Sequence, residues 1–539
     1  MAGLVVIIPA FTQDTPPQRD VMRKLGGASL IQRAIAKSRE LIDEDTDQIY
    51  VLTDSELVAL TAERAGATTH VLTDDSNTKD AIEVWRRVIV KTPRFSDSHV
   101  LVLSPFAPLV KKSTFEVARE ALTHSNASVV SMTQKYLAVD SPPDRLCLST
   151  ALLRHDHHET PIRTNAFTLF DASCLRSASE ELFSSLYLPG GDDLFEIRSY
   201  QDWWVCEKLL LRRRIVFRVI GNRQLGMGHI YRALSLAHEI TDHEIIFVTE
   251  VDHHHAVSEL ADHDYRLEVY SPDSISDDLI RLEPDLVVND ILDTSADYVS
   301  ALRDAEIQVV NFEDLGPGAL IASATFNELY DRPQIDGDNL YWGNSYFFVR
   351  DEFAEASPCP YRDTPRSLLL TFGGTDQHDL TQKLLAVVST PCREHNVHIS
   401  IVTGPGYNHY DQLKADIAGE PNISLTHATG VISKIMENAD IAITSNGRTV
   451  YEMAHMNIPA IVVPQHQREK THSFACEENG FIALEAYREG NTERAVLSSL
   501  EKLLDDSAYR KTLFDRVSKF DFSQNKRRVL NIIEELLTE

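Results

Sequence analysis

The chain has 539 residues, a hydrophobic fraction of 43% and a formal net charge of −29. This balance is typical of a globular protein and excludes a disordered chain. At roughly 150 residues per domain, the length predicts about three or four domains. The acidic excess disfavours duplex nucleic acid and anionic membranes as general partners, because both are polyanions, but it allows a local site for a small nucleotide.

The six cysteines are far apart and form no C-x-x-C pair, so we interpret them as reduced thiols of a cytoplasmic protein. The N-terminus is a short apolar run followed by a polar segment, which predicts a first strand rather than a signal peptide. No window approaches the roughly 20 uninterrupted apolar residues of a membrane helix. We therefore expect no membrane span.

Apolar runs of strand length alternate with segments of helical period along the whole chain, a pattern that predicts parallel α/β sheets. Strands are expected at 4–8, 48–53, 100–103, 127–132, 215–220, 245–249, 286–288, 308–311, 367–371, 399–402, 441–444 and 460–463. The helical segment 199–214 with a basic end and the proline-containing segment 354–365 interrupt this series. We therefore predict three Rossmann-like domains at 1–213, 214–362 and 363–539.

Several segments of the first third follow one another in a recognisable order. They are an apolar strand at 5–10, KLGGASLI at 24–31, LTDS at 52–55, LSPFAPL at 103–109, RTNA at 163–166 and EIRSYQDW at 196–203. In this order they resemble the sialic-acid cytidylyltransferases over about residues 1–212. The resemblance implies a nucleotidyltransferase domain that takes CTP, a nonulosonic acid and Mg²⁺. Its candidate site residues are Arg19, Lys24, Asp54, Asn165 and Glu196.

The chemistry of that family is only partly present. The first loop, FTQDTPP at 11–17, lacks the arginine, glycines and lysine that would neutralise CTP. Of the two metal-binding carboxylates, one is Glu196 and the other position holds Arg198, although a carboxylate pair is the usual protein ligand set for magnesium. Two interpretations stay open: active CMP transfer with Mg²⁺, or a degenerate domain that binds a nucleotide or serves as a regulatory or dimerisation module.

Four turns in the rest of the chain each follow a predicted strand: GMGHIYR at 226–232, FGGTD at 372–376, SNGRTVYE at 445–452 and PQHQ at 464–467. Glycines at a strand-to-helix turn let the backbone approach an anionic ligand and offer it free N–H groups. Because the carboxyl ends of parallel strands face one crevice, the four turns should converge on one site. His229 is a candidate general base there.

Together with NSYFFVRDEF at 344–353, these turns resemble the UDP-sugar hydrolase of pseudaminic acid biosynthesis and its spore-coat polysaccharide relatives, within the GT-B superfamily. The resemblance covers about residues 215–539. It implies that His229 activates water for attack at the anomeric carbon, without a metal, and that the C-terminal half holds UDP. The implied nucleotide- and substrate-binding residues are Gly226, Gly228, Arg232, Gly373, Gly374, Thr375, Asp376, Ser445, Asn446, Gly447, Glu452 and Gln467.

Two departures from that family lie on the sugar-binding side. The first strand ends in Arg218-Val219-Ile220 where the family has an Arg-x-Asp, and Asn289-Asp290-Ile291 stands where the family has I-D-H-Y. The identity of the sugar therefore stays open. So does the acceptor, because water in a hydrolase and a hydroxyl in a glycosyltransferase occupy the same position.

The sequence thus predicts an α/β, bifunctional nucleotide-sugar enzyme of nonulosonic acid biosynthesis. An N-terminal Rossmann-like nucleotidyltransferase domain precedes a GT-B module, and the C-terminal module hydrolyses a UDP-sugar. The alternative is a GT-B glycosyltransferase with a non-catalytic N-terminal domain. We expect a UDP-sugar, CTP and a nonulosonic acid as ligands and a second copy of the chain as partner. The histidine runs at 154–159 and 252–255 are interpreted as exposed loops rather than metal sites.

Overall fold

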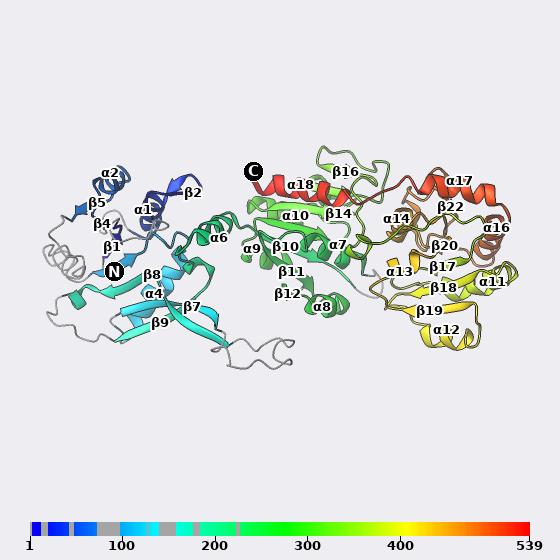
Figure 1. The fold of residues 1–539 in the computed structure, drawn as a ribbon, viewed down its shortest axis with the longest axis horizontal. Helices are drawn as coiled ribbons and strands as arrows, with labels where there is room; N and C mark the ends of the chain where they lie inside the picture. Colours follow the sequence, from blue (N-terminus) through cyan, green and yellow to red (C-terminus); the bar gives the residue numbers. More distant parts are fainter. Residues whose placement is uncertain are drawn as a thin grey trace. The chain divides into compact units, whose positions relative to one another are not determined.

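The computed structural model (Figure 1) describes residues 3–11, 20–42, 48–72, 98–125, 127, 129–138, 158–175, 184–221 and 227–538. The chain divides into two compact units, Met1–Arg212 and Arg213–Glu539, here called unit 1 and unit 2. No helix within the described ranges is long and apolar enough to cross a membrane.

Unit 1 is built on a mixed seven-stranded sheet with the order β5-β4-β1-β6-β8-β7-β9. The central strands are parallel, and β8 runs antiparallel to both β6 and β7. The strands are β1 (Leu4–Pro9), β4 (Gln48–Thr53), β5 (Thr68–Val71), β6 (His99–Leu103), β7 (Val129–Ala138), β8 (His158–Asp171) and β9 (Ser185–Gly190). The helices are α1 (Leu30–Leu41), α2 (Glu56–Arg64), α4 (Lys112–His124) and α6 (Tyr200–Leu211), and a short hairpin is formed by β2 (Lys24–Leu25) and β3 (Ala28–Ser29).

Unit 2 contains two parallel sheets, which define an N lobe and a C lobe. The N-lobe sheet has the order β12-β11-β10-β13-β14-β15-β16. Its strands are β10 (Arg214–Val219), β11 (Glu244–Glu250), β12 (Arg266–Tyr270), β13 (Leu286–Asp290), β14 (Gln308–Phe312), β15 (Ala324–Asn327) and β16 (Leu340–Trp342). Its helices are α7 (Gly228–Ala237), α8 (His254–Ala261), α9 (Ile275–Arg281) and α10 (Ala296–Asp304), with 3₁₀ turns at Pro317–Leu320 and Asp351–Phe353.

The C-lobe sheet has the order β19-β18-β17-β20-β21-β22. Its strands are β17 (Ser367–Thr371), β18 (His398–Thr403), β19 (Ile423–His427), β20 (Ile441–Thr444), β21 (Ala460–Val462) and β22 (Phe481–Ala483). Its helices are α11 (Leu380–Glu394), α12 (Tyr410–Asp416), α13 (Ser433–Met436), α14 (Thr449–His455), α15 (Gln467–Lys470), α16 (Asn491–Asp505) and α17 (Ser507–Val517), with a 3₁₀ turn at Glu477–Asn479. The last helix of the chain, α18 (Asn525–Thr538), packs on the N lobe.

Each sheet of unit 2 changes direction at its first strand, so that β10 lies between β11 and β13, and β17 lies between β18 and β20. Such a switch point opens a crevice at the carboxyl ends of the strands, which is where open α/β sheets bind ligands. The prediction of an α/β fold with parallel Rossmann-like sheets is confirmed.

Two segments join the lobes of unit 2. Helix α18, the last in the chain, lies beside the N lobe (Figure 1). It contributes Val529 and Ile533 to the hydrophobic core that contains β10, β11 and β13 of the N lobe. In the opposite direction, Tyr330 and Phe347 pack into the core of β20 and β21 of the C lobe. Each lobe of unit 2 therefore contributes residues to the hydrophobic core of the other.

Several elements differ in length from their predicted ranges, and two of these differences matter for the site. Strand β13 extends to Asp290, two residues beyond the expected range 286–288, and α7 begins at Gly228, inside the segment 226–232 that was predicted as a turn. Of the histidine run at 252–255, expected as a loop, His254 begins helix α8. Most of the run at 154–159 lies outside the described residues.

Candidate functional site

A cavity of about 750 Å³ lies between the lobes of unit 2, at the carboxyl ends of both sheets. Residues of the N lobe line it around the start of α7, and residues of the C lobe line it after β17, β18, β20 and β21. Its size is in the range of cavities that hold small-molecule ligands and cofactors.

Eight of the residues predicted from the sequence line this cavity. They are Gly228, His229, Gly373, Gly374, Thr375, Ser445, Gly447 and Glu452. Three of the four turns predicted from the sequence, at 226–232, 372–376 and 445–452, thus supply predicted residues to the lining of this cavity. Gly226 lies outside the described residues.

Four other predicted residues lie away from the cavity wall. Asp376 caps helix α11 instead, because its two carboxylate oxygens accept the backbone N–H groups of Leu380 and Thr381, each at 2.8 Å. Asn446 donates to the backbone carbonyls of Glu469 at 2.7 Å and His472 at 3.0 Å, and so holds the loop after β21.

Gln467 is exposed at the start of α15, and its near neighbour Gln465 lines the cavity in its place. The fourth residue, Arg232, is buried beneath the site rather than in its wall.

His229 sits in the first turn of α7, and its ring is held by a carboxylate from another strand. Its Nδ1 lies 2.5 Å from Oδ1 of Asp290. Asp290 is the last residue of β13 and is paired in register with Val219 of β10, the strand that leads to α7. A carboxylate on Nδ1 selects the tautomer with a proton on that nitrogen, which leaves Nε2 as the basic nitrogen.

Beneath this pair, Arg232 is almost completely buried, at 1% exposed. It donates to Asp290 at 2.6 and 2.5 Å, to Glu313 at 2.7 Å and to Glu328 at 2.8 Å. A buried guanidinium is tolerated only when it is paired and hydrogen-bonded in this way. Arg232 therefore orients the Asp290 carboxylate that in turn orients His229.

Within this cluster, positive charges counteract the effect of burial on the pKa values of the carboxylates. Burial alone would raise the pKa of Asp290, but Arg232 and His229 outweigh it and hold the pKa of Asp290 below its usual value. Burial acts in the same direction on Glu313, yet Arg232 again leaves the pKa of Glu313 strongly lowered. Both carboxylates are therefore ionised at neutral pH, and they can stabilise a positive charge on His229.

The opposite wall is formed by glycine turns of the C lobe. Gly373 has a φ of +72°, a conformation that favours glycine. A Cβ atom on Gly404, in the loop after β18, would lie 2.5 Å from the Cα and carbonyl oxygen of Gly374. Only glycine permits this close packing of two turns, and the resulting open backbone surface suits an anionic group such as a diphosphate.

Three arginines that were not predicted from the sequence, Arg350, Arg448 and Arg468, also line the cavity. Arg448 donates to Glu328 and to the carbonyl of Phe348, and burial followed by repulsion from Arg232 lowers the pKa of Arg448 to about 10. Arg350 donates through Nε to Glu452 at 2.8 Å. The only local signal for Arg448 was its place inside the SNGRT turn, and Arg350 lies in the segment between the lobes.

The candidate residues of unit 1 are spread over several elements. Lys24 on β2 and Asn165 on β8 are exposed, and Asp54 is half-buried just after β4. Arg19 lies outside the described residues.

Glu196, the residue of unit 1 that was predicted as a magnesium ligand, forms an ion pair with Arg198. Glu196 is buried, and its Oε2 accepts from Arg198 at 3.0 and 3.3 Å. A carboxylate that already binds a guanidinium does not fit the charge pattern of a magnesium site. Across the described ranges, no group of three His, Cys, Asp or Glu side chains is arranged to hold a metal ion.

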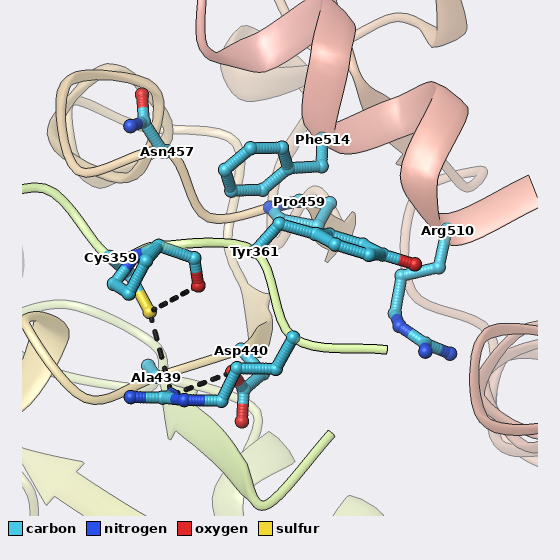
Figure 2. A pocket seen from close by; sticks show the side chains of 10 residues that line it. Cys359, Tyr361, Ala439, Asp440, Asn457, Pro459, Arg510 and Phe514 are labelled. Atoms are coloured by element: carbon cyan, nitrogen blue, oxygen red, sulfur yellow. Dashed lines mark hydrogen bonds and ion pairs between the residues drawn. The ribbon is translucent and has the colours of Figure 1, made fainter. Parts of the chain in front are cut away.

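A second cavity, of about 10 Å³, lies beside Cys359, Tyr361 and Asp440, near the amino ends of β20 and β21 in the C lobe (Figure 2). Arg362 donates to Asp440 at 2.7 Å there, and burial raises the pKa of the Cys359 thiol. The space suffices for about one water molecule. It is a packing defect rather than a ligand site.

A protein-family model matches most of the C lobe. Residues 368–524 match the family model described as "Glycosyltransferase family 28 C-terminal domain". An uncharacterised protein of Methanocaldococcus jannaschii is 27% identical over 298 residues, which cover 49% of this chain and 61% of that protein. The spore coat polysaccharide biosynthesis protein SpsG of Bacillus subtilis is 25% identical over 272 residues, or 47% of this chain and 79% of that protein.

Two of the solved structures that match part of this chain are those of Acinetobacter baumannii MurG and of Anabaena HepE in complex with UDP and glucose. The first is 14% identical, with a TM-score of 0.46, over 60% of this chain and 99% of that one. The second is 12% identical, with a TM-score of 0.41, over 60% of this chain and 100% of that one. From the family match and the SpsG relative, the C-terminal part of the chain is similar to nucleotide-sugar glycosyltransferases, and the family match lies within residues 368–524.

Proposed function

We propose that unit 2 binds a UDP-sugar in its cleft and breaks the bond between the anomeric carbon and the diphosphate. The observation that carries this proposal is that His229, which is held by Asp290, lines the same cavity as the glycine turns at Gly373, Gly374 and Gly447. A base and an anion cradle that face each other are what displacement of a nucleoside diphosphate requires.

In the proposed reaction, an acceptor oxygen attacks the anomeric carbon while Nε2 of His229 takes its proton. The bond from that carbon to the diphosphate oxygen breaks, and its electron pair leaves with UDP. The imidazolium that forms is offset by Asp290, at 2.5 Å from Nδ1. Backbone N–H groups of the glycine turns and the Arg448 guanidinium support the charge on the departing diphosphate. No metal ion is assigned a role.

Water is the first acceptor that we propose, which makes unit 2 a UDP-sugar hydrolase of nonulosonic acid biosynthesis. The second candidate is transfer of the sugar to a hydroxyl group, and the match of residues 368–524 to a glycosyltransferase family favours it. The same base serves both reactions, because water and a hydroxyl each lose one proton to it.

For unit 1 we propose a degenerate cytidylyltransferase-like domain without catalytic activity. The ion pair between Glu196 and Arg198 supports this choice over CMP transfer. The test is to incubate the full chain with CTP, Mg²⁺ and a nonulosonic acid. Formation of a CMP-sugar would contradict the proposal and would restore the bifunctional interpretation.

The test of unit 2 is to incubate the full chain with a panel of UDP-sugars, including UDP-diacetamido sugars, and to measure released UDP by ³¹P NMR. Hydrolysis predicts UDP release in buffer alone and incorporation of ¹⁸O from labelled water into the sugar. Transfer predicts release only after a hydroxyl acceptor is added. His229→Ala should abolish both, whereas His124→Ala, an exposed histidine of unit 1, should change neither. UDP release that survives His229→Ala would refute the assigned base.

A further inference from the structure

Glu328 connects the two lobes of unit 2 at the base of the cleft. It follows β15 of the N lobe and is completely buried. Its Oε1 accepts from two guanidiniums, Arg232 of the N lobe at 2.8 Å and Arg448 of the C lobe. Its backbone carbonyl also accepts from the hydroxyl of Tyr451, on α14 of the C lobe, at 3.2 Å.

These contacts make Glu328 the middle of a continuous polar path across the cleft. On one side, Arg232 binds Asp290, and Asp290 binds His229. On the other side, Arg448 follows directly on Gly447 and lines the cavity beside it. The path therefore joins the candidate base to the turn where a nucleotide would lie.

Two cations compete for one carboxylate oxygen at this link. The second oxygen of Glu328, Oε2, is buried and has no hydrogen-bond partner among the described residues. In a buried site of low effective dielectric, charges act on one another more strongly than in water. A change in how firmly Arg448 is held must therefore be felt by Glu328 and by Arg232.

We propose that Glu328 is a positioning residue that couples nucleotide binding in the C lobe to the state of His229. The proposal rests on the proposed function, because it takes the diphosphate to lie at Gly447. A bound diphosphate competes with Glu328 for Arg448. When Arg448 turns toward the phosphates, Glu328 keeps only Arg232 as its cationic partner. The negative charge of the carboxylates near His229 is then neutralised by one cation fewer. Proton uptake by His229 is thereby favoured when a nucleotide occupies the cleft.

The test uses the full chain labelled with ¹⁵N-histidine, because imidazole nitrogen shifts report protonation directly. The His229 signal is identified by its loss in His229→Gln. UDP should move this signal toward the imidazolium position in the wild type and in Glu355→Gln, a change at an exposed site. In Glu328→Gln the response should be less than about one third as large, while UDP measured by calorimetry binds at least as tightly as to the wild type, because the competitor of the diphosphate for Arg448 has lost its charge.

Steady-state kinetics give a second readout that a merely structural role would not produce. In Glu328→Gln, kcat should fall about tenfold or more while KM stays within about threefold, and Glu328→Asp should recover part of the loss. If Glu328→Gln does not fold, Arg448→Lys replaces it, since a lysine cannot keep the guanidinium contacts. The same weakened UDP response is expected.

The outcomes separate this inference from the function on which it rests. A wild type that binds no UDP overturns the proposed function and the coupling with it. UDP that binds the wild type but leaves the His229 signal unchanged overturns only the coupling. An equal response in the wild type and in Glu328→Gln does the same.

Discussion

Replacing Asp290 with Asn tests the base assignment most directly, because the change keeps the shape of the side chain and removes its charge. Asp290 accepts from His229 at 2.5 Å and from Arg232 at 2.6 and 2.5 Å. An asparagine keeps one acceptor oxygen, but its NH₂ group must face a donor on the other side. Either the imidazole loses its partner or the guanidinium does.

The size of the effect follows from these contacts. A hydrogen bond to a charged group contributes about 1.5–3 kcal/mol, and about 1.4 kcal/mol corresponds to a tenfold change in rate. Loss of the Asp290–His229 bond should therefore lower kcat about ten- to a hundredfold. Asp290 does not line the cavity, so KM for the UDP-sugar should stay within about threefold.

Unit 2 should still fold with this substitution. Arg232 keeps its contacts with Glu313 and Glu328, so the loss of stability should remain below the ~3–5 kcal/mol that follows when a buried charge loses its partner completely. Urea unfolding of the full chain, followed by circular dichroism, measures this loss.

The assay compares UDP release by the wild type, Asp290→Asn and Asp304→Asn, the last being an exposed site at the end of α10. Asp304→Asn should behave as the wild type. If folded Asp290→Asn keeps kcat within about twofold of the wild type, Asp290 does not orient the base and the proposed mechanism is wrong.

Two further predictions concern the glycine turns and pH. Gly404→Ala should weaken UDP binding about tenfold or more, because a Cβ at 2.5 Å from Gly374 must push the two turns apart. Calorimetry measures the UDP affinity. The control is Gly191→Ala of unit 1, where the atom nearest to the new Cβ is at 3.6 Å and the UDP affinity should not change. The pKa values of Asp290 and Glu313 are lowered in the folded chain, so their contribution to stability is complete above the unfolded value of about 4 and is lost as the pH falls further. The unfolding free energy should therefore decrease below about pH 4, and less steeply in Asp290→Asn, whereas equal slopes in urea titrations would contradict the shift of Asp290.

Local sequence patterns determined much of the fold and the turns that line both walls of the site. Alternation of apolar strands and helical segments predicted the parallel sheets, because buried strands and amphipathic helices each have their own period. Glycine turns such as Gly373 and Gly447 could be recognised for the same reason: each directly follows a strand, so its position at a sheet edge is a property of neighbouring residues. His229 was found in one of these turns.

Only the tertiary structure decided which charged groups act together. Asp290 pairs with a histidine 61 positions away, and Arg448 pairs with a glutamate 120 positions away, so no local pattern could connect them. Asp376 and Asn446 illustrate the converse, because they occur in the right turns yet bind backbone groups that only the folded chain brings near. The sequence specifies strand ends and turns by short-range periodicity, whereas the pairing of buried charges depends on which strands become neighbours in the sheet.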